Sequence, residues 1–324
     1  MRLTKEASAA ASVAARQRIS GLIYATPLLP SLKLGDAYGC DLRFKAENFQ
    51  LTGSFKMRGA AALMTDDGLP PGARLITSSS GNHGIACARA ASLTKRSLTV
   101  VLPKTVARAK LEKIRAYGVD VVLHGTEAGA AELHAQALAA SGGFVYVSPY
   151  NDARVIAGQG TIGLELIEQA QGTRIDTVFV AMGGGGLISG VGAVLKTFSP
   201  GTRVIGVAAA SSAALAASMA AGRVVEMEHL DTLADGVAGG VDEGSVTLAL
   251  ALQVVDEVVT CSEAEIAAAL RQLAWQENMV VEGAAALALA GFVRRADELR
   301  GRVNVVLLCG ANYDRDRILP AILG

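Results

Sequence analysis

Several features that define other classes of protein are missing from this sequence. Only 4% of its 324 residues are aromatic although 51% are hydrophobic, so the core must consist mainly of Ala, Val, Leu and Ile. That composition is common in α/β proteins with parallel sheets. The 30 Lys and Arg residues equal the 30 Asp and Glu residues in number, so nothing in the net charge indicates a nucleic-acid partner. We therefore expect an ordered protein that binds a small molecule.

Signals for a membrane, for zinc and for disulfides are also missing. No uncharged apolar run approaches the roughly 18 to 20 residues that span a bilayer. The first twenty residues are rich in alanine but contain several charges, which predicts an amphipathic surface helix and not a signal peptide. The widely spaced cysteines form no C-x-x-C pair. We expect a cytoplasmic protein without a membrane partner, in which three of the cysteines are small buried residues: Cys40, Cys87 and Cys261.

Short β-branched runs alternate with Ala- and Leu-rich stretches along the chain. The expected strands cover residues 75–77, 98–102, 119–123, 144–147, 175–181, 203–208 and 303–308. This alternation predicts βαβ units with parallel sheets, and runs that are apolar on both faces predict helices on both sides of a sheet. We predict an α/β fold of two three-layer lobes around a cleft, with residues 1–50 and 150–324 in a large domain and 51–149 in a small one.

Polar or glycine-rich clusters directly follow three of the expected strands. They cover residues 78–84, 183–186 and 309–312. Open α/β sheets bind ligands at the carboxyl ends of their parallel strands. The ligand site is therefore expected where these three clusters meet.

One lysine lies among small and apolar residues in the segment LTGSFKMRG, residues 51–59. The segment forms an expected loop-to-helix junction, and partial burial there lowers the pKa of the Lys56 amine. A neutral amine is the nucleophile that forms a Schiff base with an aldehyde. An ordinary surface lysine at a helix start is the alternative interpretation.

The segment ITSSSGNHG, residues 76–84, lies between an apolar run and a helical stretch at 85–91. Backbone N–H groups at a helix start bind anions such as a carboxylate, and the Asn82 side chain can donate a hydrogen bond to a phenolate oxygen. An ordinary Ser/Asn helix cap with glycines for the turn remains the alternative.

Four consecutive glycines lie in the segment AMGGGGL, residues 181–187, between an expected strand and an expected helix. Glycines let successive N–H groups turn inward around a phosphate, and the helix dipole favours its negative charge. A dinucleotide site would need an acidic residue about 20 residues further on, and residues 203–210 contain none. A phosphate cup is thus favoured over an NAD site and over a merely flexible turn, whose ordering would cost conformational entropy.

The segment VVLLCGAN, residues 305–312, places Cys309 at the end of an expected buried strand. A thiol there offers only a weak hydrogen bond to a ring nitrogen, so a pyridine would stay neutral and be a moderate electron sink. An inert buried cysteine is the alternative.

Together and in this order, the four segments resemble the fold-type II pyridoxal-phosphate enzymes, specifically their serine/threonine dehydratase and serine racemase branch. The likeness covers nearly the whole chain. It includes five further segments: TPL at 26–28, KAEN at 45–48, VIAGQGT at 155–161, ADG at 234–236 and EGAA at 282–285. The resemblance implies pyridoxal 5′-phosphate bound by the large domain, a small amino-acid substrate and a homodimer.

The resemblance also implies a role for each matching residue. Lys56 is the Schiff-base lysine, Phe55 packs beside the cofactor ring and Asn82 contacts the ring oxygen. Cys309 takes the place of the serine or threonine that usually faces the pyridine nitrogen. The phosphate would be held by the glycine turn and the residue after it, namely Gly183, Gly184, Gly185, Gly186 and Leu187. The substrate carboxylate would be bound by Ser79, Ser80, Asn82 and His83.

The implied reaction is elimination of water from a small β-hydroxy amino acid such as serine or threonine. The substrate amine displaces Lys56, and the freed lysine removes the Cα proton as a general base. The β-hydroxyl leaves as water, and hydrolysis of the product gives a 2-oxo acid and ammonia.

One departure from the dehydratase pattern keeps a second enzyme activity open. Ser80 occupies the position where racemases of this group place an acid/base on the cofactor face opposite the lysine. An amino-acid racemase that uses Lys56 and Ser80 is therefore the alternative function. A β-replacement synthase and a non-catalytic binding protein are less favoured, because the SSSGNHG loop resembles the dehydratase kind and the lysine and glycine turn are intact.

A second departure concerns metal binding. Ala208 and Ala214 stand at the approximate positions where relatives with a divalent-metal site carry a glutamate and an aspartate. Hard cations need oxygen ligands, so we predict that this Mg²⁺/Ca²⁺ site is absent. The chain ends about twelve residues after Asn312, so no carboxyl-terminal regulatory domain is expected.

Overall fold

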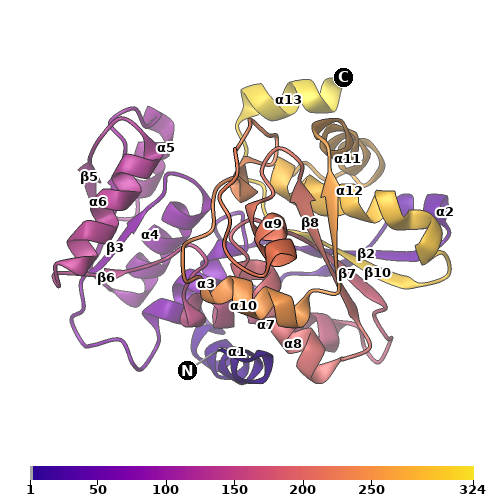
Figure 1. The fold of residues 1–324 in the computed structure, drawn as a ribbon, viewed down its shortest axis with the longest axis horizontal. Helices are drawn as coiled ribbons and strands as arrows, with labels where there is room; N and C mark the ends of the chain where they lie inside the picture. The colour runs from indigo at the N-terminus through magenta and orange to yellow at the C-terminus, as the bar shows by residue number, and fades with distance from the viewer. Residues whose placement is uncertain (1–2) are drawn as a thin grey trace.

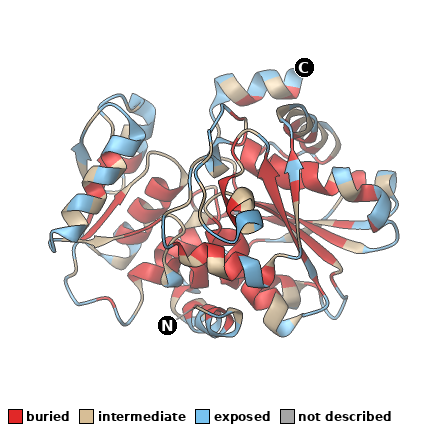
Figure 2. Ribbon diagram, in the orientation of Figure 1, coloured by how far each residue is buried: buried red, intermediate tan, exposed pale blue. Residues whose placement is uncertain are grey.

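The larger of two sheets has six strands in the order β1-β2-β10-β7-β8-β9. Figure 1 labels four of them, β2, β10, β7 and β8. The structure is a computed structural model that describes residues 3–324. The strands are β1 Leu28–Pro30, β2 Asp41–Ala46, β7 Thr177–Ala181, β8 Arg203–Ala209, β9 Glu257–Cys261 and β10 Val303–Leu308. All neighbours pair in parallel except β1, which runs antiparallel to β2. The central strands β7 and β10 are almost wholly buried, as the red strands of Figure 2 show.

Helices cover both faces of this sheet. One face carries α8 Gly186–Phe198, backed by α7 Ala153–Gln169, α1 Lys5–Ile19 and α10 Val246–Val254. The other carries α12 Gly283–Arg295, backed by α11 Glu263–Gln276, against which α13 Arg315–Leu323 packs. Of two short helices, α2 Leu34–Tyr38 contacts β2 and α9 Ala214–Ala221 contacts α10. Helix α1 buries one face against α7 and α8, as expected of an amphipathic helix.

The smaller sheet has four parallel strands in the order β5-β4-β3-β6. Its strands are β3 Leu75–Ser78, β4 Leu98–Leu102, β5 Asp120–Leu123 and β6 Val145–Tyr146. Helix α6 Ala128–Ala140 packs on one face. Helix α4 Asn82–Thr94 packs on the other, between α3 Lys56–Met64 and α5 Arg108–Arg115. Both sheets are therefore the middle layers of three-layer α/β units, which confirms the predicted fold class.

All seven strands expected from the sequence are present within two residues of their predicted ends. Three others were missed, because β1 contains Pro30, β2 carries charged residues and β9 is half-exposed. Cys40 is half-buried, so its predicted burial is wrong, whereas Cys87 and Cys261 are buried as predicted. The domain boundaries near residues 51 and 149 stay a prediction. Within residues 3–324, no helix is both long and apolar enough to cross a membrane.

Helices α3 and α7 cross in close backbone contact, and this crossing joins the elements of the two sheets. A Cβ atom on Gly158 would lie 2.4 Å from the Arg58 carbonyl oxygen, and one on Gly59 would lie 3.0 Å from the Val155 carbonyl oxygen. No side chain fits at either position. The close approach to α3 explains the first glycine of the segment VIAGQGT in α7, whereas the second, Gly160, lies against Ser12 of α1.

A fully buried ionic cluster lies next to this crossing. The Arg58 guanidinium donates to the carboxylates of Glu47 and Glu165 at 2.6–2.8 Å, and Lys45 Nζ donates to Glu165 at 2.5 Å. Although burial alone would raise the pKa of Glu47, the charge of Arg58 brings it below its usual value. The cluster connects α3 with β2, α7 and the 3-10 turn at 47–49. It therefore fixes the position of the first turn of α3, which begins at Lys56.

Candidate active site

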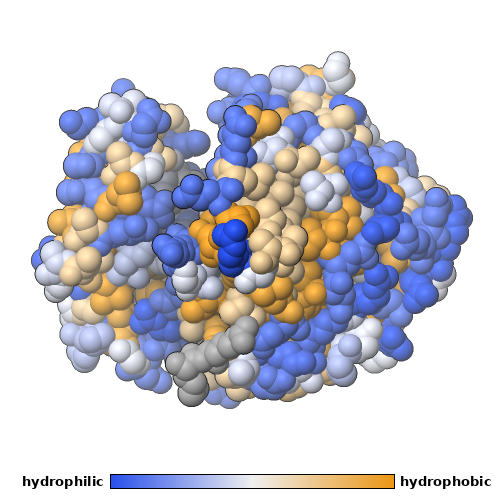
Figure 3. Space-filling view, viewed as in Figure 1, coloured by the Kyte–Doolittle hydropathy of each residue, from blue (hydrophilic) through white to orange (hydrophobic). Residues whose placement is uncertain are grey.

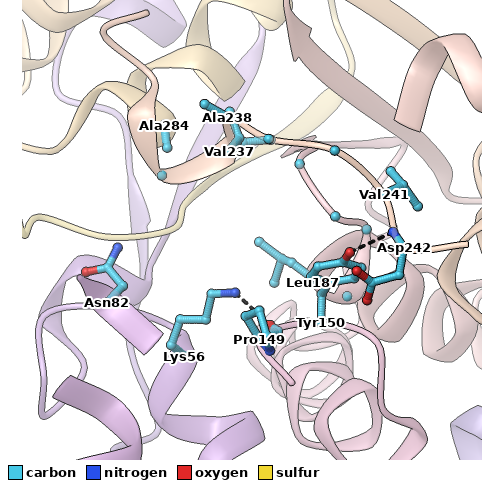
Figure 4. A pocket seen from close by; sticks show the side chains of 18 of the residues that line it. Lys56, Asn82, Pro149, Tyr150, Leu187, Val237, Ala238, Val241, Asp242 and Ala284 are labelled. Carbon is cyan, nitrogen blue, oxygen red and sulfur yellow. Dashed lines mark hydrogen bonds between the residues drawn. The ribbon is translucent and has the colours of Figure 1, made fainter. Parts of the chain in front are cut away.

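Lys56 is the first residue of α3, and its amine enters a cavity (Figure 4). The chain before it is fixed to the end of β10, because the Phe55 N–H donates to the Cys309 carbonyl oxygen at 3.0 Å. The Lys56 Nζ donates to the Pro149 carbonyl oxygen at 2.7 Å. Burial lowers the pKa of this amine to about 8, although Cys87, Cys309 and Glu282 act in the opposite direction. A partly neutral amine at neutral pH suits nucleophilic and general-base chemistry.

The four-glycine turn lies across the cavity from Lys56, between β7 and α8. Gly185 has a φ of +89°, a conformation that side chains rarely adopt. A Cβ atom on Gly184 would lie 2.5 Å from the Tyr150 ring, so this ring packs directly against the turn. Backbone N–H groups that precede a helix in this way form an anion site, and the dipole of α8 adds to it. Leu187, in the first turn of α8, contributes an apolar wall.

The SSSGNHG loop links β3 to α4, which begins at Asn82. Ser79, Ser80, Asn82 and His83 line a second cavity, which shares Lys56 and Asn82 with the first. His83 is buried, and its Nε2 donates to the Val147 carbonyl oxygen at 2.9 Å. Burial and the neighbouring Lys56 lower the pKa of His83 to about 3. The imidazole is therefore neutral and brings no positive charge to the loop.

Glu282 belongs to the site, and no role for it is predicted from the sequence. It precedes α12, is 3% exposed and lines both cavities. Its carboxyl oxygens accept from the Asn82 side-chain nitrogen at 3.0 Å and from the Asn312 backbone N–H at 3.1 Å. The available signal was a lone acidic residue between two valines and the Ala-rich run at 283–290. Such a residue inside an apolar stretch indicates a buried carboxyl group.

Cys309 follows β10 and is buried beside Glu282. Its Sγ donates a weak hydrogen bond to Glu282 Oε1 at 3.7 Å. Burial and the neighbouring Glu282 hold the pKa of Cys309 well above the usual thiol value. The side chain is therefore a neutral thiol, as expected from the sequence.

The two cavities have volumes of about 510 and 460 Å³, and Figure 3 shows the surface hollowed between the small-sheet region and α13. The first is lined by the residues that were predicted to hold the cofactor: Phe55, Lys56, Asn82, Gly183, Gly184, Gly185, Gly186, Leu187 and Cys309. The cavities thus bring together every predicted site residue, although the role of each stays a prediction. Within residues 3–324, no three His, Cys, Asp or Glu side chains cluster closely enough to hold a metal ion.

The donor set fits an aromatic aldehyde that carries a phosphate. A lysine with a lowered pKa faces a helix-terminal glycine turn across a cavity with room for a ring. The remaining walls combine apolar residues with polar ones, among them Glu132, Asp242 and Glu282. An α/β protein with this site is an enzyme that holds such a cofactor through a lysine. The chain belongs to the pyridoxal-phosphate dependent enzyme family, whose model matches residues 19–310. This result confirms both the resemblance and the cofactor inferred from the sequence.

Curated relatives of the chain act on hydroxy amino acids, according to their names. L-threonine ammonia-lyase of Thermotoga maritima is 36% identical over 94% of this chain and 75% of its own length. L-threo-3-hydroxyaspartate ammonia-lyase of Saccharomyces cerevisiae is 34% identical over 96% of this chain and 94% of its own.

Solved structures similar to this chain include both a threonine deaminase and a serine racemase. Processed threonine deaminase isoform 2 from Solanum lycopersicum has a TM-score of 0.91 and 32% identity over 97% of this chain and 91% of its own. Maize serine racemase has a TM-score of 0.86 and 28% identity over 97% of this chain and 96% of its own. Dehydratases and racemases therefore share this fold.

Proposed function

We propose that the protein is a pyridoxal-phosphate dependent ammonia-lyase that eliminates water from a small β-hydroxy amino acid such as serine or threonine. The products are a 2-oxo acid and ammonia. One observation carries the proposal: the Lys56 amine, with its pKa lowered to about 8, shares a cavity with the glycine turn at the start of α8. The relatives named as threonine ammonia-lyases support the reaction type.

The chain's own groups suit the cofactor as follows. The N–H groups of residues 183–186 would bind the phosphate, and Phe55 and Leu187 would contact apolar parts of the ring. When bound, pyridoxal phosphate supplies an electron sink for the negative charge that develops at the substrate Cα. Cys309, a neutral thiol, would leave the pyridine nitrogen uncharged.

Lys56 would act as the general base at the substrate Cα. Its lowered pKa leaves part of the amine unprotonated near neutral pH, so it has a lone pair that can accept a proton. The hydrogen bond to the Pro149 carbonyl oxygen directs the amine across the cavity.

The substrate carboxylate would bind at the start of α4. Ser79 and Ser80 line the second cavity beside backbone N–H groups of the first turn, and Asn82 begins the helix. His83 is neutral, so carboxylate binding would depend on hydrogen bonds and on the helix dipole.

The test is to incubate the purified holoenzyme with a panel of L- and D-hydroxy amino acids and to record 2-oxo acid and ammonia. We expect both products from L-serine or L-threonine, and none from a Lys56→Ala variant. The proposal is wrong if the protein binds no pyridoxal phosphate, or binds it and turns over no member of the panel.

Racemisation is the second candidate. Ser80 is half-buried and lines the same cavity as Lys56, and solved racemase structures are among the similar ones. Ser80→Ala separates the two functions, since a racemase would lose interconversion of the enantiomers and a dehydratase would keep producing 2-oxo acid.

The proposal also covers the oligomeric state, the cellular location and the domain boundaries of the protein. On the family likeness we propose a cytoplasmic homodimer, with the large domain at 1–50 and 150–324 and the small domain at 51–149. Light scattering of the purified protein tests the dimer, which a monomeric mass would exclude.

A further inference from the structure

The carboxyl group of Glu282 accepts hydrogen bonds from Asn82 and Cys309, the two polar side chains that are predicted to contact the cofactor ring. Asn82 Nδ2 lies 3.0 Å from each carboxyl oxygen, and Cys309 Sγ lies 3.7 Å from Oε1. Asn82 begins α4 beside the small sheet, whereas Cys309 follows β10 of the large sheet. Glu282, a single buried residue, therefore binds side chains from both the small-sheet and the large-sheet parts of the molecule.

Hydrogen bonds extend from this carboxyl group in two further steps. The Asn312 side-chain amide donates to Asn82 Oδ1 at 2.8 Å and to the Thr52 carbonyl oxygen at 2.7 Å. Lys113 Nζ donates to Asn312 Oδ1 at 2.9 Å. The Asn82 amide is thus held on its donor side by Glu282 and on its acceptor side by Asn312, which leaves it little rotational freedom.

The charged and titratable groups around Glu282 come from several elements. Lys56 of α3, Asp235 of the 3-10 turn Asp235–Val237 and Cys309 all interact with it electrostatically. Burial raises the pKa of Glu282 to about 7; the hydrogen bonds from Asn82 and Asn312 act in the opposite direction, and Asp235 adds to the rise. The carboxyl group therefore changes charge near pH 7.

We propose that Glu282 is a positioning residue for the cofactor: its carboxyl group fixes Asn82 and Cys309, and its charge acts on the nitrogen of Lys56. The inference rests on the proposed function, because it assumes that pyridoxal phosphate binds at Lys56. An ionised Glu282 stabilises a positive charge on the lysine nitrogen, and a neutral Glu282 does not. Glu282 thereby makes the charge at Lys56 depend on pH.

The test uses the holoenzyme and Glu282→Gln, which keeps the side-chain shape but cannot ionise. The visible absorption band of the lysine-bound cofactor is titrated with pH. We expect the midpoint of the titration to fall by about one pH unit in the variant, because an opposite charge near the nitrogen is lost. We also expect the dissociation constant of pyridoxal phosphate to rise about tenfold, since the hydrogen bonds to Asn82 and Cys309 are disturbed.

Two further variants separate charge from position. Glu282→Asp keeps the charge on a shorter side chain, so it should retain a midpoint near the wild-type value and still weaken cofactor binding. Glu277→Gln is the matched control, because Glu277 is also 3% exposed and accepts the Leu32 and Leu34 N–H groups outside both cavities. It should change neither the midpoint nor the dissociation constant.

A readout on the cofactor-free protein completes the experiment. Infrared spectra recorded across pH should contain the carbonyl band of a neutral carboxylic acid that disappears near pH 7 and is absent from Glu282→Gln. If the wild-type protein forms no cofactor band, the proposed function fails. If the band forms and Glu282→Gln alters neither its midpoint nor the dissociation constant, only the role of Glu282 is overturned.

Discussion

Lys56 and Arg58 stand two residues apart on the first turn of α3, and their surroundings are opposite. Burial lowers the pKa of Lys56 to about 8, and its amine donates to the uncharged backbone carbonyl of Pro149. Burial alone would also lower the pKa of Arg58, but Glu47 and Glu165 raise it above its usual value. Paired carboxylates thus keep the buried Arg58 charged, whereas the half-buried Lys56, which donates to a neutral carbonyl, can lose its proton.

The difference shows how one helix turn can carry both a stabilising group and a reactive one. A buried ion pair with all its hydrogen bonds made is costly to break. A buried cation without a charged partner, by contrast, becomes more stable when it loses its proton. The ionic cluster at Arg58 fixes the position of the turn, and the cavity sets the protonation of Lys56. Substitutions at the two positions should therefore act in opposite directions on stability.

Lys56→Met should have the largest effect, on activity. The variant loses both the group that binds the cofactor and the general base, so we expect 2-oxo acid formation to fall by about 10⁴-fold or more. Turnover assays of the purified variant with added pyridoxal phosphate measure the loss. Activity within tenfold of the wild type would show that another residue carries the chemistry.

Arg58→Met should have the largest effect on stability. The substitution removes the salt-bridge partner of the buried Glu47 carboxylate and leaves Glu165 paired with Lys45 alone, and breaking a buried pair in this way typically costs about 3–5 kcal/mol of unfolding free energy. Urea denaturation of the cofactor-free protein measures this cost. Arg203→Met is the control, because Arg203 pairs with Glu257 at the surface and should cost about 0–1 kcal/mol. Equal losses in the two variants would remove the contrast between buried and exposed pairs.

Lys56→Met should stabilise the cofactor-free protein. Lys56 has a pKa of about 8 in the folded state against a usual value of 10.5, so the folded state binds this proton more weakly than the unfolded state. The folded protein is therefore penalised fully below pH 8, and the penalty disappears as the pH rises to about 10.5. We expect a gain of about 2–3 kcal/mol at pH 7 and none above pH 10.5. A loss of stability at pH 7 would mean that the amine is well solvated or paired.

Magnesium should have the smallest effect. Ala208 on β8 and Ala214 at the start of α9 offer no carboxylate, so added Mg²⁺ should leave the melting temperature and the turnover rate unchanged. Titration of MgCl₂ into the metal-free holoenzyme, with scanning calorimetry and activity assays, checks this. A saturable rise in either quantity would reveal a site formed by other oxygen ligands.

Most of the fold could be predicted because parallel, buried strands leave a strong local pattern. The strands β3, β4, β7, β8 and β10 are short apolar runs, three of them followed by glycine or polar clusters, and each lies where expected. The glycine turn and Lys56 were recognisable for the same reason, since their chemistry depends on residues that are neighbours in sequence.

The rest depends on contacts between distant segments. Glu282 meets Asn82 across 200 residues of sequence, and Arg58 meets Glu165 across 107. Neither pairing leaves a local pattern, because a charged residue in an apolar stretch does not reveal which element will face it. Glu282 and Arg58 can be recognised in the sequence as charged residues in apolar surroundings, but the residues that pair with them can be identified only from the fold.

The backbone contact between α3 and α7 also limits how the enzyme could be altered by directed evolution. At Gly158 even a methyl group would push against the Arg58 carbonyl and shift the turn that carries Lys56, so a library randomised there would retain essentially the parental residue. Gly129, which lines the cavity on α6, has open space where its side chain would be. Engineers who seek a new substrate range should diversify α6 and leave the helix crossing untouched.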